Sequence, residues 1–189
     1  MGNRLSKIVT RTGDAGTTGL GDGSRVDKDS PRIDALGEVD ELNSLIGVLR
    51  ASALPPVIEA RVQEVLSVVQ HDLFDLGGEL CIPGAATMKT EQVAQLEAWA
   101  EEFNARLTPL KEFILPGGTP AAAHAHLART VCRRAERSVV RLAHHETVSD
   151  HARQYLNRLS DLLFILGRSL NKEAGGSDVL WRHNRGQQG

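Results

Sequence analysis

Aromatic residues are scarce in this chain: four Phe, two Trp and one Tyr occur among 189 residues. Proteins that bind single-stranded nucleic acid usually stack bases on several aromatic side chains. The formal net charge of -2 also excludes a polycation that would bind duplexes with its whole surface. From composition we therefore expect no nucleic acid partner.

Cysteines and long apolar runs are also few. The two cysteines, Cys81 and Cys132, have no CxxC partner, so their spacing specifies neither a disulfide framework nor a zinc site. No apolar stretch approaches the roughly 18 residues that span a bilayer, and the polar N-terminus lacks the apolar core of a signal peptide. These absences predict a protein that has no membrane partner and works in a reducing cytoplasm.

The length of 189 residues predicts a single domain, which we divide into an N-terminal segment (1–30), a helical region (31–175) and a C-terminal tail (176–189). Apolar residues recur at helical spacing in five stretches separated by Pro or Gly. These stretches predict helices from Pro31 up to Pro55, Ile58 up to Pro83, Thr90 to Leu107, Pro120 to Leu142 and Tyr155 to near Gly175. No alternating strand pattern occurs, so the expected fold is an all-α bundle of five helices. We expect the tail to fray after Trp181.

The N-terminal segment is rich in glycine and threonine and shows no helical or strand period between Thr10 and Arg25. Glycine lets backbone N–H groups approach an anion closely, and threonine adds a hydroxyl donor, so an ordered phosphate-binding loop is one interpretation. The segment has neither the G-K-[ST] ending of a Walker A loop nor a dinucleotide-binding fingerprint. By composition alone a flexible N-terminal arm is the simpler interpretation, and both stay open.

Five arginines lie within thirteen residues of the fourth predicted helix: Arg129, Arg133, Arg134, Arg137 and Arg141. The first, second and fourth of them are spaced i, i+4 and i+8 and share one side of the helix with Glu136. Guanidinium groups bind phosphate oxygens in a bidentate manner, so this side suits a polyphosphate. A solvated face of ordinary salt bridges is the alternative that these residues leave open.

Other polar residues indicate less. Asp40 in the first predicted helix could hold an arginine of a neighbouring element in place, although interhelical ion pairs of this kind are common. His124 and His126 point about 200° apart on a helix, and no HExxH motif occurs, so we interpret them as solvent or packing residues. Because no Ser, His and Asp arrangement is recognisable, the attacking nucleophile is expected to belong to a substrate.

Five ordered segments resemble a known family: KIVTRTGDAGTTGLGDGSRVDKDSPRI (7–33), GEVDELNSLIG (37–47), FILPGG (113–118), ARTVCRRAER (128–137) and YLNRLSDLLF (155–164). They resemble, in the same order, the signature blocks of the PduO-type ATP:cob(I)alamin adenosyltransferases. Together they span nearly the whole chain, which makes them far more specific than any single motif described above.

The resemblance implies a five-helix bundle that assembles as a homotrimer, with active sites where subunits meet. It also implies transfer of the 5'-deoxyadenosyl group of ATP to cob(I)alamin, which forms adenosylcobalamin and releases triphosphate. A magnesium ion belongs to the implied reaction, although the sequence does not identify its ligands. A flavin-type reductase and a cobalamin-dependent enzyme are candidate partners.

The family pattern implies residue roles as well. One subunit would hold ATP through Thr10, Arg11, Thr12, Gly13, Thr18 and Lys28. The neighbouring subunit would complete that site with Arg133, Arg134, Glu136, Arg137 and Asn157. By the same resemblance Arg129 would pair with Asp40 near the corrin, and Phe113 would form a wall under its lower face. Since cob(I)alamin is itself a strong nucleophile, this reaction needs no nucleophilic side chain.

A different class of function is compatible with the loop and the arginines: a non-catalytic helical protein that binds ATP and reports it to a partner. The FILPGG block discriminates between the two, because a nucleotide sensor needs no apolar wall beside its phosphate site. A third interpretation, a nucleic-acid binder that uses Arg129 to Arg141, predicts steep salt dependence of oligonucleotide binding.

Overall fold

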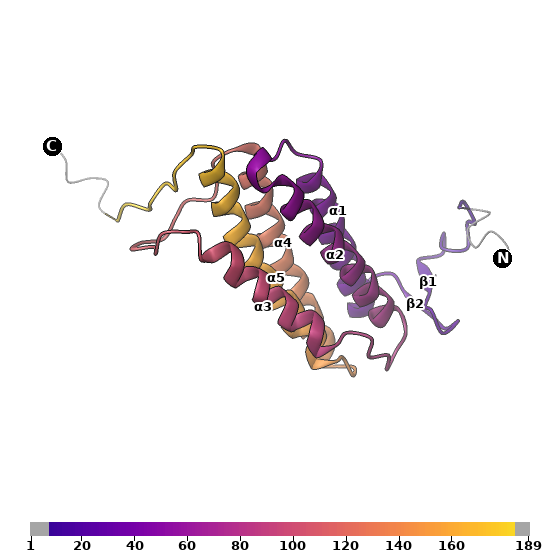
Figure 1. Cartoon of the computed structure of the whole chain (residues 1–189). Coiled ribbons are helices and arrows are strands. Elements are labelled where there is room, and N and C mark those ends of the chain that lie inside the picture. Colours follow the sequence, from indigo (N-terminus) through magenta and orange to yellow (C-terminus); the bar gives the residue numbers. More distant parts are fainter. Residues whose placement is uncertain (1–7, 184–189) are drawn as a thin grey trace.

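The computed structural model describes residues 8–183, in which it places five helices and one small sheet (Figure 1). The helices are α1 (Pro31–Arg50), α2 (Pro56–Cys81), α3 (Thr90–Asn104), α4 (Pro120–Ala143) and α5 (Asp150–Glu173). The expected all-α bundle of five helices is confirmed. Among these described helices there is no candidate for a membrane span.

Three helices begin at a proline, in the first turn, where a missing N–H is harmless: Pro31, Pro56 and Pro120. Thr119 also caps α4, because its side chain accepts a hydrogen bond from the Ala122 N–H at 3.3 Å. The third helix ends at Asn104 rather than at Leu107, since the chain tightens there into a turn in which the Leu107 N–H donates to the Asn104 carbonyl at 2.9 Å. The fifth helix begins at Asp150, five residues before the predicted Tyr155, because Ser149 caps its polar first turn.

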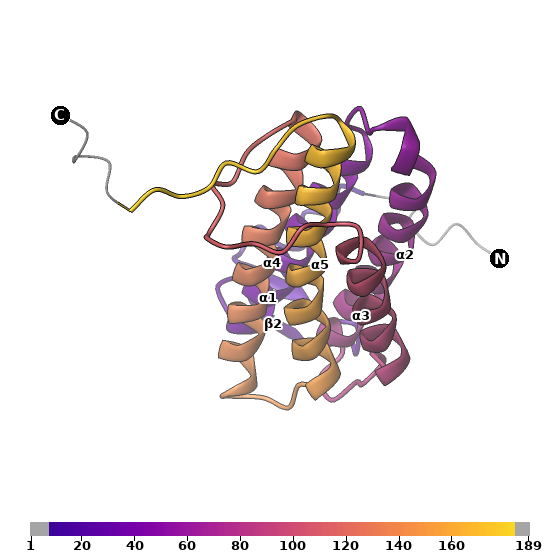
Figure 2. The same ribbon diagram turned by 60° about the vertical axis from the view of Figure 1, so that its left-hand side comes forward.

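The helices α4 and α5 pack against each other at the centre, with α1 against α4, α3 against α5, and α2 against α1 (Figures 1 and 2). The inner side of α4 consists largely of small, fully buried residues, which include Ala122, Ala125, Ala128 and Ala135. Small side chains allow neighbouring helices to approach closely. The long arginine side chains of α4 therefore lie on its remaining surface.

The N-terminal segment contains a β-hairpin, which the expectation of a loop without strands missed. β1 (Thr17–Gly19) pairs antiparallel with β2 (Arg25–Asp27). The turn includes Gly23 at a φ of +89°, and strands of three residues are too short to show an alternating pattern. The hairpin lies outside the bundle (Figure 1), attached by the Gly21 N–H, which donates to the Cys81 carbonyl at 2.8 Å.

The C-terminal tail returns to the irregular segment between α3 and α4. Ile114 and Leu180 form an isolated antiparallel bridge, and the Leu115 N–H donates to the Val179 carbonyl at 2.8 Å. The first part of the tail is therefore folded onto the bundle. The fraying predicted after Trp181 falls largely on residues 184–189, which lie outside the described residues.

Candidate active site

One arginine that the sequence did not single out organises the N-terminal loop. The guanidinium of Arg25 donates to the Thr12 carbonyl at 2.7 Å, and to the Thr17 carbonyl and hydroxyl at 3.1 and 2.8 Å. The hydroxyls of Thr10 and Thr12 lie 3.0 Å apart on the exposed side of the loop. What marks Arg25 as an organising residue is its position opposite Gly19 in the hairpin. That position is known only once the strand pairing is known.

Gly13 and Lys28 lie face to face across the loop. A Cβ at Gly13 would lie 2.9 Å from the Nζ of Lys28, so a side chain there would displace the ammonium group. The Lys28 N–H donates to the Gly16 carbonyl at 2.9 Å. Arg11 has a φ of 59°, the only positive φ of a non-glycine residue in 8–183, and Thr18 lies on β1. The residues that the resemblance assigns to ATP thus share one hydrogen-bonded segment.

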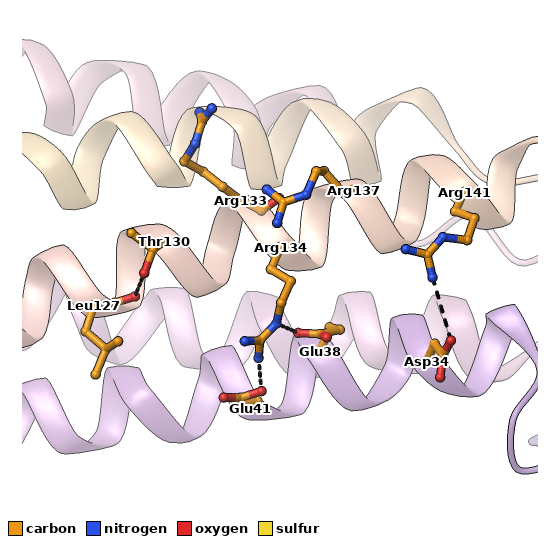
Figure 3. A network of polar contacts seen from close by, with 9 residues as sticks. All are labelled: Asp34, Glu38, Glu41, Leu127, Thr130, Arg133, Arg134, Arg137 and Arg141. Carbon is orange, nitrogen blue, oxygen red and sulfur yellow. Dashed lines mark hydrogen bonds and ion pairs between the residues drawn. The ribbon is translucent and has the colours of Figure 1, made fainter.

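Four of the five arginines of α4 divide into two sets, as Figure 3 shows. Arg134 reaches α1, where its Nε donates to Glu38 at 2.5 Å and its Nη2 donates to Glu41. The bond to Glu38 raises the pKa of Arg134. Arg141 lies 3.8 Å from Asp34, also on α1. Carboxylates of α1 therefore offset the charge of two of the arginines.

Arg133 and Arg137 form the second set, and neither makes an ion pair with any carboxylate in the described part of the chain. Both are exposed, and both line a pocket of about 390 Å³ together with Glu136. The Nδ2 of Asn157 on α5 donates to Glu136 at 3.0 Å. The structure thus brings together four of the five residues predicted to complete an ATP site, while Arg134 turns toward α1.

The N-terminal loop and the arginines of α4 are not joined within one chain. The hydrogen bonds of the described loop residues stay within the loop or reach α1 and α2, and none reaches α4. In Figure 1 the hairpin lies to the right of the helices, away from α4. Asp40 is likewise exposed on α1 and makes no ion pair with Arg129 or any other described residue. The predicted halves of the site are separate on a single subunit.

Phe113 is a large apolar side chain with 77% of its surface exposed. It lines a pocket of about 660 Å³ that also includes Ile114 and Pro116 from its own segment and Phe164 of α5. A role in the core is excluded, because a core aromatic ring would be buried. The ring is instead placed to contact a ligand or a second chain.

Arg129 and His126 of α4 bring two unpaired polar atoms to the same pocket. The Nε of Arg129 and the Nδ1 of His126 are buried without a hydrogen-bond partner in the described residues. Burial, and secondarily the charge of Arg133, lowers the pKa of Arg129. Burial, and secondarily the charge of Arg129, lowers the pKa of His126 and favours its neutral form. Buried polar atoms usually have partners, so these two indicate a pocket that a ligand or a neighbouring chain completes.

The two histidines of α4 have separate surroundings. A nitrogen of His124 lies 2.8 Å from the Ser52 hydroxyl, whereas the ring of His126 packs against Gly167 of α5. Among residues 8–183 no three His, Cys, Asp or Glu side chains are grouped so that they could hold a metal ion. The contact with Ser52 agrees with the interpretation of His124 as a solvent or packing residue, whereas His126 also lines the pocket that contains Phe113.

Comparison with known proteins identifies the family. A family model described as cobalamin adenosyltransferase matches residues 8–170. The chain belongs to the cobalamin adenosyltransferase family. A cobalamin adenosyltransferase of Cupriavidus metallidurans is 62% identical, over 98% of this chain and 99% of the relative. A corrinoid adenosyltransferase of Mycobacterium tuberculosis is 46% identical, over 96% of each chain.

Solved structures from this adenosyltransferase family share the fold. One is a PduO-type ATP:corrinoid adenosyltransferase from Lactobacillus reuteri in which a phenylalanine is replaced by histidine, complexed with cobalamin and ATP. It is 33% identical with a TM-score of 0.88, over 94% of this chain and 97% of that chain. A second, with an arginine replaced by lysine and complexed with ATP, is 34% identical with a TM-score of 0.86, over 93% of this chain and 100% of that chain. The family resemblance is confirmed, and the roles of individual residues stay predictions.

Proposed function

We propose that this family member transfers the 5'-deoxyadenosyl group of ATP to cob(I)alamin, forming adenosylcobalamin and releasing triphosphate. A solved relative complexed with cobalamin and ATP supports both substrates. The observation that carries the proposal is Phe113, an exposed ring at a pocket of about 660 Å³, in a chain that also has a glycine-rich loop and unpaired arginines. A protein that only sensed ATP would have no use for such a wall.

The bonds that form and break define what the protein must supply. The electron pair of cobalt(I) attacks C5' of ATP, the C5'–O bond breaks, and its electrons leave with triphosphate. No side chain has to attack or accept a proton, so the protein orients the substrates and stabilises the growing negative charge. We assign that charge stabilisation to Lys28, Arg133 and Arg137, which carry no carboxylate partner in the described chain.

We assign the complete site to a homotrimer in which ATP lies between the loop of one subunit and α4 and α5 of the next. The separation of the loop from the arginines within one chain supports this arrangement. Asp40 and Arg129 support it too, because each carries a charge without a partner in the described chain. An ion pair between Asp40 of one subunit and Arg129 of the next would satisfy both.

Arg134, Glu136 and Asn157 have different tasks in this proposal. Arg134 contributes less to ATP binding than Arg133, because Glu38 and Glu41 already offset its charge. Asn157 holds Glu136 by a hydrogen bond of 3.0 Å, so this carboxylate keeps a fixed place beside the arginines.

Magnesium fits the site as a companion of the triphosphate. Residues 8–183 offer no cluster of three ligating side chains for a cage made by the protein alone. In nucleotide sites Mg²⁺ commonly takes its ligands from phosphate oxygens, water and one or two carboxylates. Glu136 would hold such an ion, since it lines the same pocket as Arg133 and Arg137. When bound, the ion would supply further positive charge to the triphosphate.

Phe113 serves the step before the transfer. Cobalt(II) is hard to reduce while its lower axial ligand is bound, and an apolar ring beneath the corrin would exclude that ligand. The exposure of Phe113 at its pocket suits this task. The electron would come from a separate reductase of flavin type, and a cobalamin-dependent enzyme would use the product.

One assay tests the function: the protein is mixed with ATP, magnesium and chemically reduced cobalamin. We expect the absorption spectrum of cob(I)alamin to convert to that of adenosylcobalamin, with triphosphate as the second product. Arg133→Ala should slow this conversion. Arg153→Ala is the matched control, because it removes an arginine whose single ion pair within residues 8–183 is with Asp150 at the start of α5. ATP binding without adenosylcobalamin would favour the ATP-sensing alternative.

A further inference from the structure

Phe113 lies in the irregular segment between α3 and α4 (105–119), which we call the Phe113 segment. Because this segment forms no helix or sheet of its own, contacts with other parts of the chain must hold the ring at its pocket. The tail supplies main-chain bonds to this segment. The Trp181 N–H donates to the Phe113 carbonyl at 2.7 Å, and the Leu115 N–H donates to the Val179 carbonyl at 2.8 Å. An isolated pair of short strands, such as the tail and the Phe113 segment would form, is only marginally stable in water. Further contacts must therefore anchor the tail to the helices.

Arg168 of α5 provides that anchor at one end. Only 5% of its surface is exposed, although it carries a positive charge. Its Nε donates to the Oδ2 of Asp178 in the tail at 2.8 Å, and its Nη2 donates to the Thr108 carbonyl at 2.9 Å. One buried guanidinium thus joins the tail to the beginning of the Phe113 segment. A buried charge that loses its partner is costly, so this contact resists opening.

Asn171, nearly one turn further along α5, provides the anchor at the other end and is also buried. Its Nδ2 donates to the Ser177 carbonyl at 3.0 Å, and its Oδ1 accepts from the Thr119 N–H at 3.3 Å. Gly118 and Gly176 make room for it, because a Cβ at either position would collide with the Asn171 Oδ1. The side-chain amide of Asn171 thus bonds both the end of the Phe113 segment and the start of the tail.

We propose that Arg168, Asn171 and Asp178 are positioning residues that hold the tail as a strand beside Phe113 and thereby fix this ring as the wall of the corrinoid pocket. The inference rests on the proposed function for the role of the wall. None of the three lines the pocket of about 660 Å³ that contains Phe113. They act on the ring through the backbone, without contact to the substrate.

A main-chain test avoids any change to the buried charge. Trp181→Pro removes the N–H that bonds the Phe113 carbonyl, while Trp181→Ala removes the indole and keeps that N–H. From cob(II)alamin with a reductant, we expect the proline variant to form adenosylcobalamin roughly tenfold more slowly than the alanine variant. A misplacement of about 1 Å can slow a reaction about 100-fold, and we expect the ring to move by less than that. Starting from cob(I)alamin, the two should be equal. If the proline and alanine variants also reacted at equal rates from cob(II)alamin, the proposal would be overturned.

Asp178→Asn tests the ion pair with the buried Arg168. We expect weaker hydrogen-exchange protection of the Leu115 and Trp181 amides. We also expect loss of the spectrum of four-coordinate cob(II)alamin, the form without a lower axial ligand. Asp178→Glu should partly restore both. Glu64→Gln is the matched control, since it breaks an ion pair with Arg61 on the exposed side of α2. Unchanged protection in Asp178→Asn would overturn the anchor even if the enzyme is active. Conversely, a parent protein that forms no adenosylcobalamin would refute the proposed function, while the exchange data would still decide on the anchor.

Discussion

Two irregular segments carry the proposed site, and they are held in different ways. The side-chain hydrogen bonds that hold the N-terminal loop come from an exposed group, the fork of Arg25, and one main-chain bond joins Gly21 to the end of α2. The Phe113 segment is held by buried groups, the side chains of Arg168 and Asn171. The two sets of contacts differ in how readily water molecules can replace them.

Exposed polar contacts contribute little net free energy, whereas opening a buried pair leaves a desolvated charge. In our proposal the loop can therefore adjust when a nucleotide and a neighbouring subunit arrive, whereas the ring of Phe113 is positioned in advance by its own chain. These properties match the two substrates, because a triphosphate has to be enclosed, whereas the lower ligand of cobalt has to be kept out.

The largest effect is expected for Phe113→Ala. Because 77% of the ring is exposed, the free energy of unfolding should change by no more than about 0.5 kcal/mol. Activity from cob(II)alamin should fall about 100-fold as the lower ligand returns to cobalt, whereas cob(I)alamin should still be adenosylated. Urea unfolding and assays from both oxidation states measure these effects. A large loss of stability would instead make Phe113 a core residue.

Arg133→Ala should act on the nucleotide alone. Losing a charge-assisted contact to the triphosphate should weaken ATP binding by about 1.5–3 kcal/mol, roughly tenfold or more. Arg134→Ala should weaken it less, because Glu38 and Glu41 already engage that guanidinium. Isothermal titration with ATP measures both variants, with Arg153→Ala as control. If Arg134→Ala had the larger effect, the division of the arginines into two sets would be wrong.

Arg25→Ala tests whether exposed contacts organise the loop. We expect a loss in ATP affinity of about 1 kcal/mol, roughly fivefold, because the nucleotide must then order Thr12 and Thr17 itself. Thermal unfolding should match that of the parent, since the hairpin lies outside the bundle. A marked drop in unfolding temperature would show that the loop supports the fold and would remove its contrast with the wall.

The smallest effect concerns pH. Burial lowers the pKa of His126 in the folded state, a shift that Arg129 increases and Asp178 opposes. As pH falls through the ordinary histidine range near about 6.5, the unfolded chain binds this proton first. Stability is then lost until the lower folded-state pKa is passed. His126→Gln should flatten this part of the stability profile, measured by urea unfolding between pH 7 and pH 5, whereas identical slopes would mean that His126 titrates alike in the folded and unfolded chain.

Sequence predicted the helices well because their starts have local causes, such as the prolines at positions 31, 56 and 120. It missed the hairpin, because three-residue strands have no visible period. It also missed that α1 carboxylates engage Arg134, since no pattern within α4 shows what its neighbour presents. Partners across a fold depend on packing rather than on spacing.

The Phe113 region shows the same limit more sharply. An apolar run of Phe, Ile and Leu is ordinarily expected to be buried, and only the family resemblance predicted a wall. Arg168 stands within the apolar stripe of α5, and its partner Asp178 lies beyond the turn at Gly175 and Gly176. Nothing local in the tail indicates that it folds back. The residues that we propose to position Phe113 therefore became visible only in three dimensions.

Mixing two inactive variants tests most directly whether a neighbouring subunit completes the nucleotide loop. Lys28→Ala weakens ATP binding by the loop and Arg133→Ala weakens it by the helix, so each variant alone should have little activity at an ATP concentration that saturates only the parent. In a mixed trimer one of the three shared sites combines an intact loop with an intact helix, and we expect recovery of roughly one third of the parent activity per trimer. Verified mixed trimers that recover no activity would contradict the shared site and place the loop and the arginines of one chain in the same active site.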